Sequence, residues 1–280
     1  MVPLLIGGAA AYGLVVGGLY LMQEGLLFAR AAARQPNYPL PPHSERIRLY
    51  TPDGDRIVGN LVRASRRSRG LVLGFPGNAW NADDCTVWLA QRLPDFDIVV
   101  FHYRGYAPSE GEPSEKALFA DAELIYDVVV EGIRPERVYA FGASLGSGVA
   151  SWLARARPLH GLLLVTPFDS VEAIARARYF FAPVKWLLKH PFRSDRHLAG
   201  LEVPVAVLMA SDDQVVPRER TEALLAVVRR PVLVETIPDT THGGIYDSPR
   251  VDPALRRAMA ALEKAHEPLA DGDLVTARRA

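Results

Sequence analysis

The chain has 280 residues, of which 49% are hydrophobic and 23% charged, a balance typical of a globular protein with a sizeable core. Its 32 Lys and Arg residues equal its 32 Asp and Glu residues, and no basic stripe with interleaved aromatics is present, so nucleic acid is not expected as a partner. Cys85 is the only cysteine, which excludes an intrachain disulfide and a multi-cysteine metal site. We expect Cys85 to be buried and to pack as a small apolar side chain.

The first segment, residues 2–22, contains no charged residue and is about as long as a helix that crosses a bilayer. A signal peptide is the main alternative, but the run lacks a preceding positive charge and is longer than the usual apolar core of such a peptide. We therefore predict an uncleaved single-pass anchor over residues 1–24. Arg30 and Arg34 follow the span, which favours a cytoplasmic location for the bulk of the chain, with a periplasmic or extracellular location left open.

Small residues recur every four positions on one face of the predicted anchor, at Ala9, Gly13 and Gly17. Such spacing lets two membrane helices approach closely and predicts weak homodimerisation, although glycine is also simply common in membrane helices. Residues 25–44 are predicted to form a linker, with a stiff, extended proline-rich part at 36–42.

After the linker the pattern becomes one of short strands. Two alternating segments, 47–50 and 57–62, flank a Pro-Asp-Gly-Asp turn and predict a β-hairpin. Apolar runs then alternate with helical segments, which predicts a mainly parallel sheet with helices on both faces. We expect strands near 71–75, 98–101, 138–141, 162–165, 205–209 and 232–236, and helices near 83–93, 114–131, 145–155, 218–228 and 253–265.

One turn in this alternation carries a nucleophile motif. Residues 142–146 read Gly-Ala-Ser-Leu-Gly between an apolar strand and a helical stretch of small residues. In a G-x-S-x-G motif the serine lies on a sharp strand-to-helix turn, and the flanking glycines avoid collisions there. Ser144 is therefore predicted at the carboxyl end of the sheet, where open α/β sheets place their chemistry. A glycine-rich helix start that merely packs closely is the alternative.

Acyl transfer by such a serine also needs a base, a carboxylate to orient the base, and donors for the oxyanion. Among seven histidines, His242 lies in a glycine-flanked loop after the last strand, and Asp212 or Asp213 follows the strand before it. The backbone N–H groups of Leu145 and Asn78 are the expected oxyanion donors, one at a helix N-terminus and one after a glycine.

From about residue 45 to residue 265 the chain resembles the α/β-hydrolase superfamily. Within it, the chain looks like the membrane-anchored abhydrolase branch, whose relatives include lysophospholipases and protein depalmitoylases. The serine, aspartate and histidine candidates also follow the chain order of that superfamily. The resemblance rests on Pro-Gly-Asn at 76–78, Tyr-Arg-Gly-Tyr at 103–106, Ser-Glu-Gly at 109–111, Gly-Ala-Ser-Leu-Gly-Ser-Gly at 142–148, Asp-Gln-Val-Val-Pro at 213–217 and His242.

The resemblance implies an α/β-hydrolase fold over residues 45–267 and assigns the roles of its site residues. Ser144, Asp213 and His242 take the triad positions, and Asn78 and Leu145 form the oxyanion hole.

Three further residues bear on this assignment. Asp169 is the reserve carboxylate, because some hydrolases place the acid after that earlier strand. Two positions depart from the family pattern: Pro76 stands where the family usually has His, and His102 stands where the branch often has Asp. We interpret His102 as a strand-end residue and not as a second base.

The predicted function is that of a serine hydrolase that cleaves carboxylic ester or thioester bonds through an acyl-enzyme intermediate. The expected substrate is an acyl lipid or another acylated molecule, and neither a metal nor an organic cofactor is required. A serine peptidase of the same fold and a catalytically inactive membrane-associated scaffold are the alternatives. A haloalkane dehalogenase is disfavoured because the residue at the turn is Ser and not Asp.

Residues 171–198 are too long for a simple crossover helix and are predicted to form a short lid over the active site. Residues 268–280 are predicted to form a C-terminal tail. Pro183 suits a helix start, and the following residues place an aromatic and two cations near an apolar stripe, as in a membrane-interface helix. The alternative is a lid packed on its own domain with Trp186 covering the pocket. The residues concerned are Phe180, Phe181, Val184, Lys185, Trp186, Leu187, Leu188 and Lys189.

Overall fold

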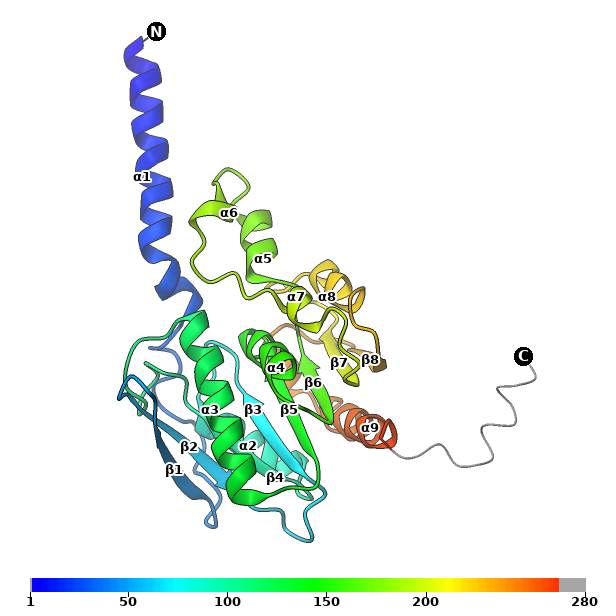
Figure 1. Cartoon of the computed structure of the whole chain (residues 1–280). Helices are drawn as coiled ribbons and strands as arrows, with labels where there is room; N and C mark the ends of the chain where they lie inside the picture. The colour runs from blue at the N-terminus through cyan, green and yellow to red at the C-terminus, as the bar shows by residue number, and fades with distance from the viewer. Residues whose placement is uncertain (1, 267–280) are drawn as a thin grey trace, which may run out of the picture.

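The computed structural model describes residues 2–266, without the side chains of residues 2–6 and 9. The predicted C-terminal tail and the side chain of Ala9 therefore lie outside the described part. Figure 1 shows one long helix leaving a domain in which helices cover both faces of a twisted sheet.

The sheet has eight strands in the order β1-β2-β4-β3-β5-β6-β7-β8. Hairpin strand β1 pairs antiparallel with β2, and β2 antiparallel with β4, while all the remaining neighbours are parallel. The predicted hairpin and mainly parallel sheet are confirmed. The strands are β1 (Glu45–Tyr50), β2 (Arg56–Val62), β3 (Leu71–Phe75), β4 (Asp97–Phe101), β5 (Val138–Ala143), β6 (Gly161–Val165), β7 (Val205–Ala210) and β8 (Pro231–Ile237).

The helices follow the predicted positions, and each of the five expected ones lies within three residues of its predicted bounds. They are α1 (Val2–Leu27), α2 (Ala82–Arg92), α3 (Glu115–Ile133), α4 (Leu145–Ala156), α5 (Val171–Arg178), α6 (Val184–Leu187), α7 (Ser194–Leu198), α8 (Arg218–Leu225), α9 (Val251–Lys264) and the 3-10 helix η1 (Gly244–Asp247).

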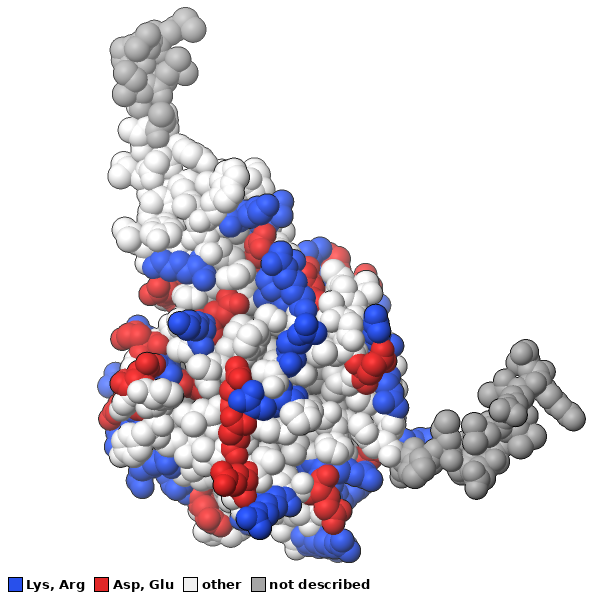
Figure 2. Space-filling model, in the orientation of Figure 1, with Lys and Arg blue, Asp and Glu red and all other residues white. Residues whose placement is uncertain are grey.

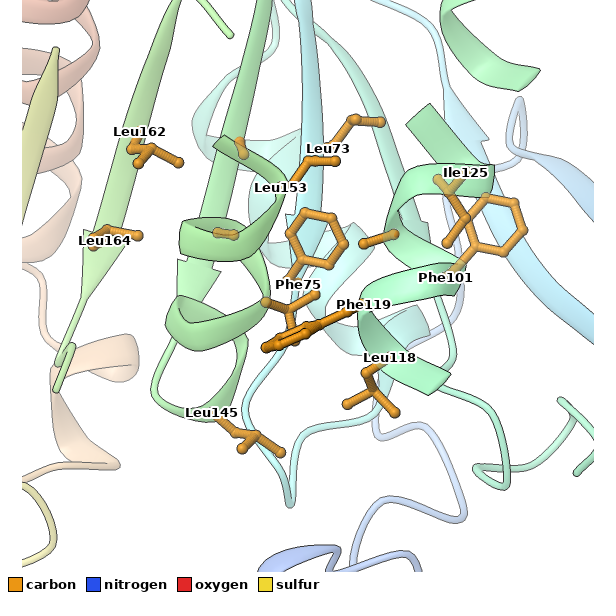
Figure 3. Packing of buried hydrophobic residues seen from close by; sticks show 14 of the residues in the cluster. Leu73, Phe75, Phe101, Leu118, Phe119, Ile125, Leu145, Leu153, Leu162 and Leu164 are labelled. Carbon is orange, nitrogen blue, oxygen red and sulfur yellow. The ribbon is translucent and has the colours of Figure 1, made fainter. Parts of the chain in front are cut away.

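The core consists of two apolar layers, one on each face of the sheet. Alternate residues of β6 supply both, since Leu162 and Leu164 belong to one cluster and Leu163 and Val165 to the other. Figure 3 shows the first layer, where side chains of β3 and β6 lie against those of α3 and α4. Cys85 is fully buried in the second layer, as predicted. This burial on both faces explains why the strands read as continuous apolar runs.

The segment that follows α1 is docked on the domain. Phe28 and Ala33 are buried, and the backbone oxygen of Ala33 accepts a hydrogen bond of 2.8 Å from the Asn81 side chain. Further along, the Asp84 carboxylate accepts hydrogen bonds from both amide groups of Asn37. Part of the predicted linker therefore belongs to the packed structure, because its polar groups form hydrogen bonds with residues at the start of α2.

Helix α1 is long and apolar enough to cross a membrane, and it is the one helix of the described chain with that property, over the window Ala10–Leu27. A signal sequence would pass the same test of length and composition. Figure 2 shows the described part of α1 without charged side chains down to a rim of basic and acidic residues at its base.

The predicted lid lies between β6 and β7 and contains α5, α6 and α7. Helix α6 begins after Pro183 as expected, but it is a single turn and not a longer interface helix. The Trp186 side chain is 82% exposed and does not line the pocket beneath, so the alternative in which it covers that pocket is wrong. Val184, Leu187 and Leu188 do line it, as their predicted shared face implies.

Candidate active site

The turn between β5 and α4 is a single residue, Ser144, in a strained backbone conformation. Its φ of 48° and ψ of −117° lie in a region that residues with a side chain rarely adopt. The surroundings hold it there: its N–H donates to the Val165 oxygen of β6 at 3.0 Å. A Cβ atom on Gly142 would lie 2.7 Å from the Gly146 oxygen, and one on Gly146 would collide with the Phe75 carbonyl group. The two glycines of the motif are thus required by close backbone packing.

His242, in the turn after β8, joins the serine to a carboxylate. Its Nε2 lies 2.9 Å from the Ser144 Oγ, and its Nδ1 lies 2.7 Å from the Asp213 Oδ2. The other oxygen of Asp213 accepts the backbone N–H groups of Val215 and Val216 at 2.9 and 2.7 Å, which fixes the carboxylate. A carboxylate at Nδ1 keeps the imidazole proton there and leaves Nε2 free to accept the hydroxyl proton.

The other two candidate carboxylates have different partners. Asp212 accepts a hydrogen bond of 2.7 Å from the Ser211 hydroxyl. Asp169 pairs with Arg220 at 3.2 Å, and its burial raises the pKa of its carboxyl group. The structure therefore brings Asp213, and neither Asp212 nor Asp169, to the imidazole.

Both residues expected to supply the oxyanion donors lie beside the serine. Asn78 and Leu145 line the same pocket as Ser144, and a Cβ atom on Gly77 would lie 3.6 Å from the Ser144 Cβ. Within residues 2–266, neither the backbone N–H of Asn78 nor that of Leu145 donates to a protein acceptor. Two unpaired backbone donors beside a nucleophile are the arrangement that an oxyanion requires.

The loop that carries Asn78 is held from both sides. The Asn78 side chain donates to the Leu27 oxygen at the end of α1 at 3.0 Å. The buried Tyr103 hydroxyl, whose pKa is raised by burial, donates to the Pro76 oxygen at 2.8 Å. Pro76 is therefore anchored through its carbonyl oxygen, a contact that does not depend on its side chain.

His102 lies outside this arrangement. Its Nε2 is 2.8 Å from the Asp83 carboxylate, which also accepts hydrogen bonds from Arg46 and Asn60. Burial alone would raise the pKa of Asp83, but these hydrogen bonds outweigh it and hold that pKa well below its ordinary range. The interpretation of His102 as a strand-end residue agrees with this buried network between β2, β4 and α2.

Comparisons with known proteins indicate the family to which the chain belongs. A family model described as alpha/beta hydrolase fold matches residues 71–189. An uncharacterized protein of Mycobacterium tuberculosis (strain ATCC 25618 / H37Rv) is 29% identical over 88% of this chain and 90% of its own length. The lysophosphatidylserine lipase ABHD12 of Danio rerio is 30% identical over 71% of this chain, which spans 60% of that protein. The alpha-beta hydrolase structure from Vibrio vulnificus superposes with a TM-score of 0.69 at 21% identity, covering 86% of this chain and 92% of that one.

This chain is a member of the α/β-hydrolase superfamily. The predicted family and fold class are confirmed, and hydrolase activity is supported by the family.

Two pockets of the hydrolase meet at Ser144. One, of about 290 Å³, is mainly apolar and is lined by α1, by Phe168 and by the lid. The other, of about 540 Å³, lies on the α2 side and is more polar, with Asn37, Gln91, Arg92 and His242 on its wall. The Ser144 hydroxyl therefore lies at the junction of an apolar space and a more polar one.

Aromatic rings line the more polar pocket on the α2 side, which is called the polar pocket below. The rings of Trp80 and Tyr246 lie 4.7 Å apart, and the Trp88 indole donates to the Tyr246 oxygen at 2.8 Å. The Arg92 guanidinium lies 4.5 Å from the Trp88 ring centre and pairs with Asp252 at 2.7 Å. This wall combines flat apolar surfaces with fixed polar groups.

Sequence reasoning missed the contribution of α1 to the hydrolase site. Six residues of that helix line the apolar pocket: Val16, Leu19, Tyr20, Gln23, Leu26 and Leu27. One signal pointed to it, because Gln23 is a polar residue at the end of an apolar span and needs a partner. Its side-chain amide donates to the Leu187 oxygen at 3.2 Å and accepts from the Lys189 N–H at 2.8 Å.

Proposed function

We propose that this hydrolase cleaves carboxylic ester or thioester bonds of acyl lipids, or of other acylated molecules, through an acyl-enzyme intermediate on Ser144. The observation that carries the proposal is the hydrogen-bonded chain from Ser144 through His242 to Asp213, with the serine on a strained turn. The same residue types in the same roles perform acyl transfer on several unrelated folds.

In this mechanism the Ser144 oxygen attacks the acyl carbon while His242 Nε2 takes the hydroxyl proton. The carbonyl oxygen becomes an oxyanion that accepts hydrogen bonds from the backbone N–H groups of Asn78 and Leu145. Collapse of the tetrahedral species breaks the bond to the alcohol or thiol, which leaves with the proton from His242. Water then attacks the acyl-enzyme by the same steps in reverse, and the carboxylic acid is released.

The two pockets at Ser144 support an acyl lipid as substrate. The apolar pocket fits a hydrocarbon chain, and the polar pocket on the α2 side fits a hydrophilic leaving group. A relative named lysophosphatidylserine lipase, which is 30% identical over 71% of this chain, supports the same class. A small ester would leave most of the apolar wall without a contact.

The location that fits this substrate is a membrane. We propose that α1 is a single-pass anchor and that the domain lies on the cytoplasmic side, because Arg30 and Arg34 follow the span. A peptidase and an inactive scaffold are the alternatives, and both are outcomes of the experiment that follows.

The test is labelling of the full-length protein in detergent with a fluorophosphonate probe, followed by hydrolysis of a panel of acyl esters. Ser144→Ala should abolish labelling and lower kcat by more than about a thousandfold, with little change in Tm because Ala keeps the same Cβ atom. Ser151→Ala is the matched control, since Ser151 is a buried serine of α4 bonded to the Ser147 oxygen. Full labelling of Ser144→Ala, or a kcat above about one hundredth of the wild-type value, would refute the assignment of the nucleophile. Probe labelling with hydrolysis of a peptide substrate but of no ester would indicate a peptidase, and a wild-type chain that shows neither labelling nor turnover would indicate an inactive scaffold.

A further inference from the structure

We infer that one face of α1 is the acyl-binding wall of the site, so that the anchor helix itself selects which acyl chains reach Ser144. The face is defined by Val16, Leu19, Gln23 and Leu27 and is called the α1 wall below. The inference rests on the proposed function and names the part of the chain that determines its substrate specificity.

The α1 wall is one face of a regular helix. Successive residues of the wall lie three or four positions apart, and that spacing places them on a common side of the helix. Val16 and Leu19 are half-buried against the cavity, whereas Leu14 and Leu21 on other sides of the helix are 78% and 80% exposed. One face therefore has a protein partner and an apolar space, while the rest of the helix is free to face lipid.

The lid forms the opposite wall and is tied to α1 by hydrogen bonds. Besides the pair from Gln23, the Tyr12 hydroxyl donates to the Phe181 oxygen at 2.9 Å. Lys189 pairs with Glu24 at 2.8 Å, at the base of the helix. These contacts hold the lid alongside α1 over three helical turns, and the apolar cavity lies between them.

The cavity has a defined inner end. The Leu27 oxygen accepts the hydrogen bond from Asn78, so this end of the α1 wall adjoins the loop of the expected oxyanion donor. Val16 precedes Leu27 by eleven residues, which corresponds to about 16 Å along a helix axis. An acyl chain with its carbonyl carbon at Ser144 would therefore extend along α1 toward the middle of the apolar span.

The same direction identifies the source of the chain as a membrane leaflet. If α1 crosses a hydrocarbon layer of about 30 Å, the level of Tyr12 lies inside that layer. The lid touches α1 at this level, and beside this contact its Phe180 side chain is 85% exposed. The Trp186 side chain of α6 is similarly exposed, at 82%. Exposed aromatic residues next to a membrane span favour insertion of the lid into the leaflet, where lipid chains run parallel to α1.

The experiment uses the full-length chain in phospholipid nanodiscs and p-nitrophenyl esters graded from acetate to palmitate. Leu19→Trp should fill the cavity and lower the ratio of palmitate to acetate kcat/KM by at least about tenfold. Val16→Trp, farther from Ser144, should affect only the longest esters. Leu21→Trp is the matched control, because it makes the same change on an exposed side of the helix. Identical chain-length profiles for Leu19→Trp and Leu21→Trp would overturn the inference.

A second measurement separates this inference from the proposed function. Palmitate binding is measured with the full-length Ser144→Ala chain, alone and combined with Leu19→Trp or with Leu21→Trp. A loss of affinity of about tenfold with Leu19→Trp but not with Leu21→Trp supports the α1 wall even if no ester is hydrolysed. Ester hydrolysis by the wild type, together with palmitate binding that neither variant changes, would leave the proposed function standing and remove the α1 wall.

Discussion

Two regions surround Ser144, and they are built from different parts of the chain. On one side, the turns after β5, β7 and β8 bring Ser144, Asp213 and His242 together. His242 joins the other two by hydrogen bonds of 2.7 and 2.9 Å. On the other side, α1 and the lid enclose an apolar cavity with segments that lie outside the sheet. In the proposed mechanism the chemistry therefore depends on sheet topology, and the choice of substrate depends on the added segments.

The two sides also differ in how firmly they are held. Strand β5 is buried throughout, so the reactive turn can open only if the core opens. Helix α5 contains no fully buried residue, and Gln23 and Tyr12 hold the lid by a few hydrogen bonds. Segments with few buried contacts open at a low free energy. We therefore expect changes at the catalytic turns to affect all substrates, and changes at the α1 wall to affect only long ones.

The largest expected effect on this contrast comes from Asp213→Asn. The amide cannot hold the Nδ1 proton of His242 in the same way, so kcat should fall by about ten-thousandfold. The fall should be equal for acetate and palmitate esters, because the carboxylate acts on the imidazole and not on the acyl chain. Steady-state kinetics on both esters measure it.

Two aspartates near the same edge supply the controls. Asp212 is bonded to Ser211 and Asp169 to Arg220, so their Asn variants should keep kcat close to wild type. A larger loss from either control than from Asp213→Asn would reassign the carboxylate.

An intermediate effect is expected from Gln23→Leu. The variant removes both hydrogen bonds to the lid backbone, each of which contributes about 0.5–1.5 kcal/mol. We expect kcat/KM for palmitate esters to fall by roughly tenfold while acetate hydrolysis stays near the wild-type rate. Tyr12→Phe keeps the ring and removes one hydrogen bond to Phe181, so the same ester pair should show a smaller loss. Equal losses on acetate and palmitate would mean that Gln23 supports the whole fold and not the α1 wall.

The contrast between the two sides also explains what the sequence could reveal. The positions of the strands along the chain and the motif residues around Ser144 and His242 are local sequence patterns. The parallel sheet then brings the carboxyl ends of these strands together. Local pattern alone left Asp212 and Asp213 open, and the family resemblance assigned Asp213. In the structure it is the Asp213 carboxylate that lies 2.7 Å from the His242 Nδ1.

The α1 wall had no comparable pattern. It depends on contacts between residues more than 150 positions apart, and an apolar helix looks the same whether lipid or a cavity covers it. Helix α6 is shorter than its apolar spacing suggests, because that spacing continues through Leu188, where the backbone turns to an extended conformation.

The smallest expected effect is a weakening of the lid side at acidic pH, centred on His190. This residue lines the apolar cavity, its Nδ1 accepts the Glu115 N–H at 3.3 Å, and its ring packs against Phe28. Burial lowers its pKa, a shift that the nearby Glu24 opposes and Lys189 reinforces. The folded chain therefore favours the neutral imidazole.

Because the folded pKa is below the unfolded value of about 6.5, the unfolded chain binds the proton first as pH falls. Stability should therefore be full above pH 7 and decline below about pH 6.5, and each kcal/mol lost lowers Tm by about 2–4 °C. Burial also lowers the pKa of His160 and His197, so they contribute to the same decline. His190→Asn keeps an acceptor for the Glu115 N–H and cannot titrate, so its Tm should fall less between pH 7.5 and pH 5.5. His43→Asn, at an exposed position outside the pocket, should follow the wild type. A His190→Asn curve parallel to both would show that protonation of the cavity wall does not limit acid stability.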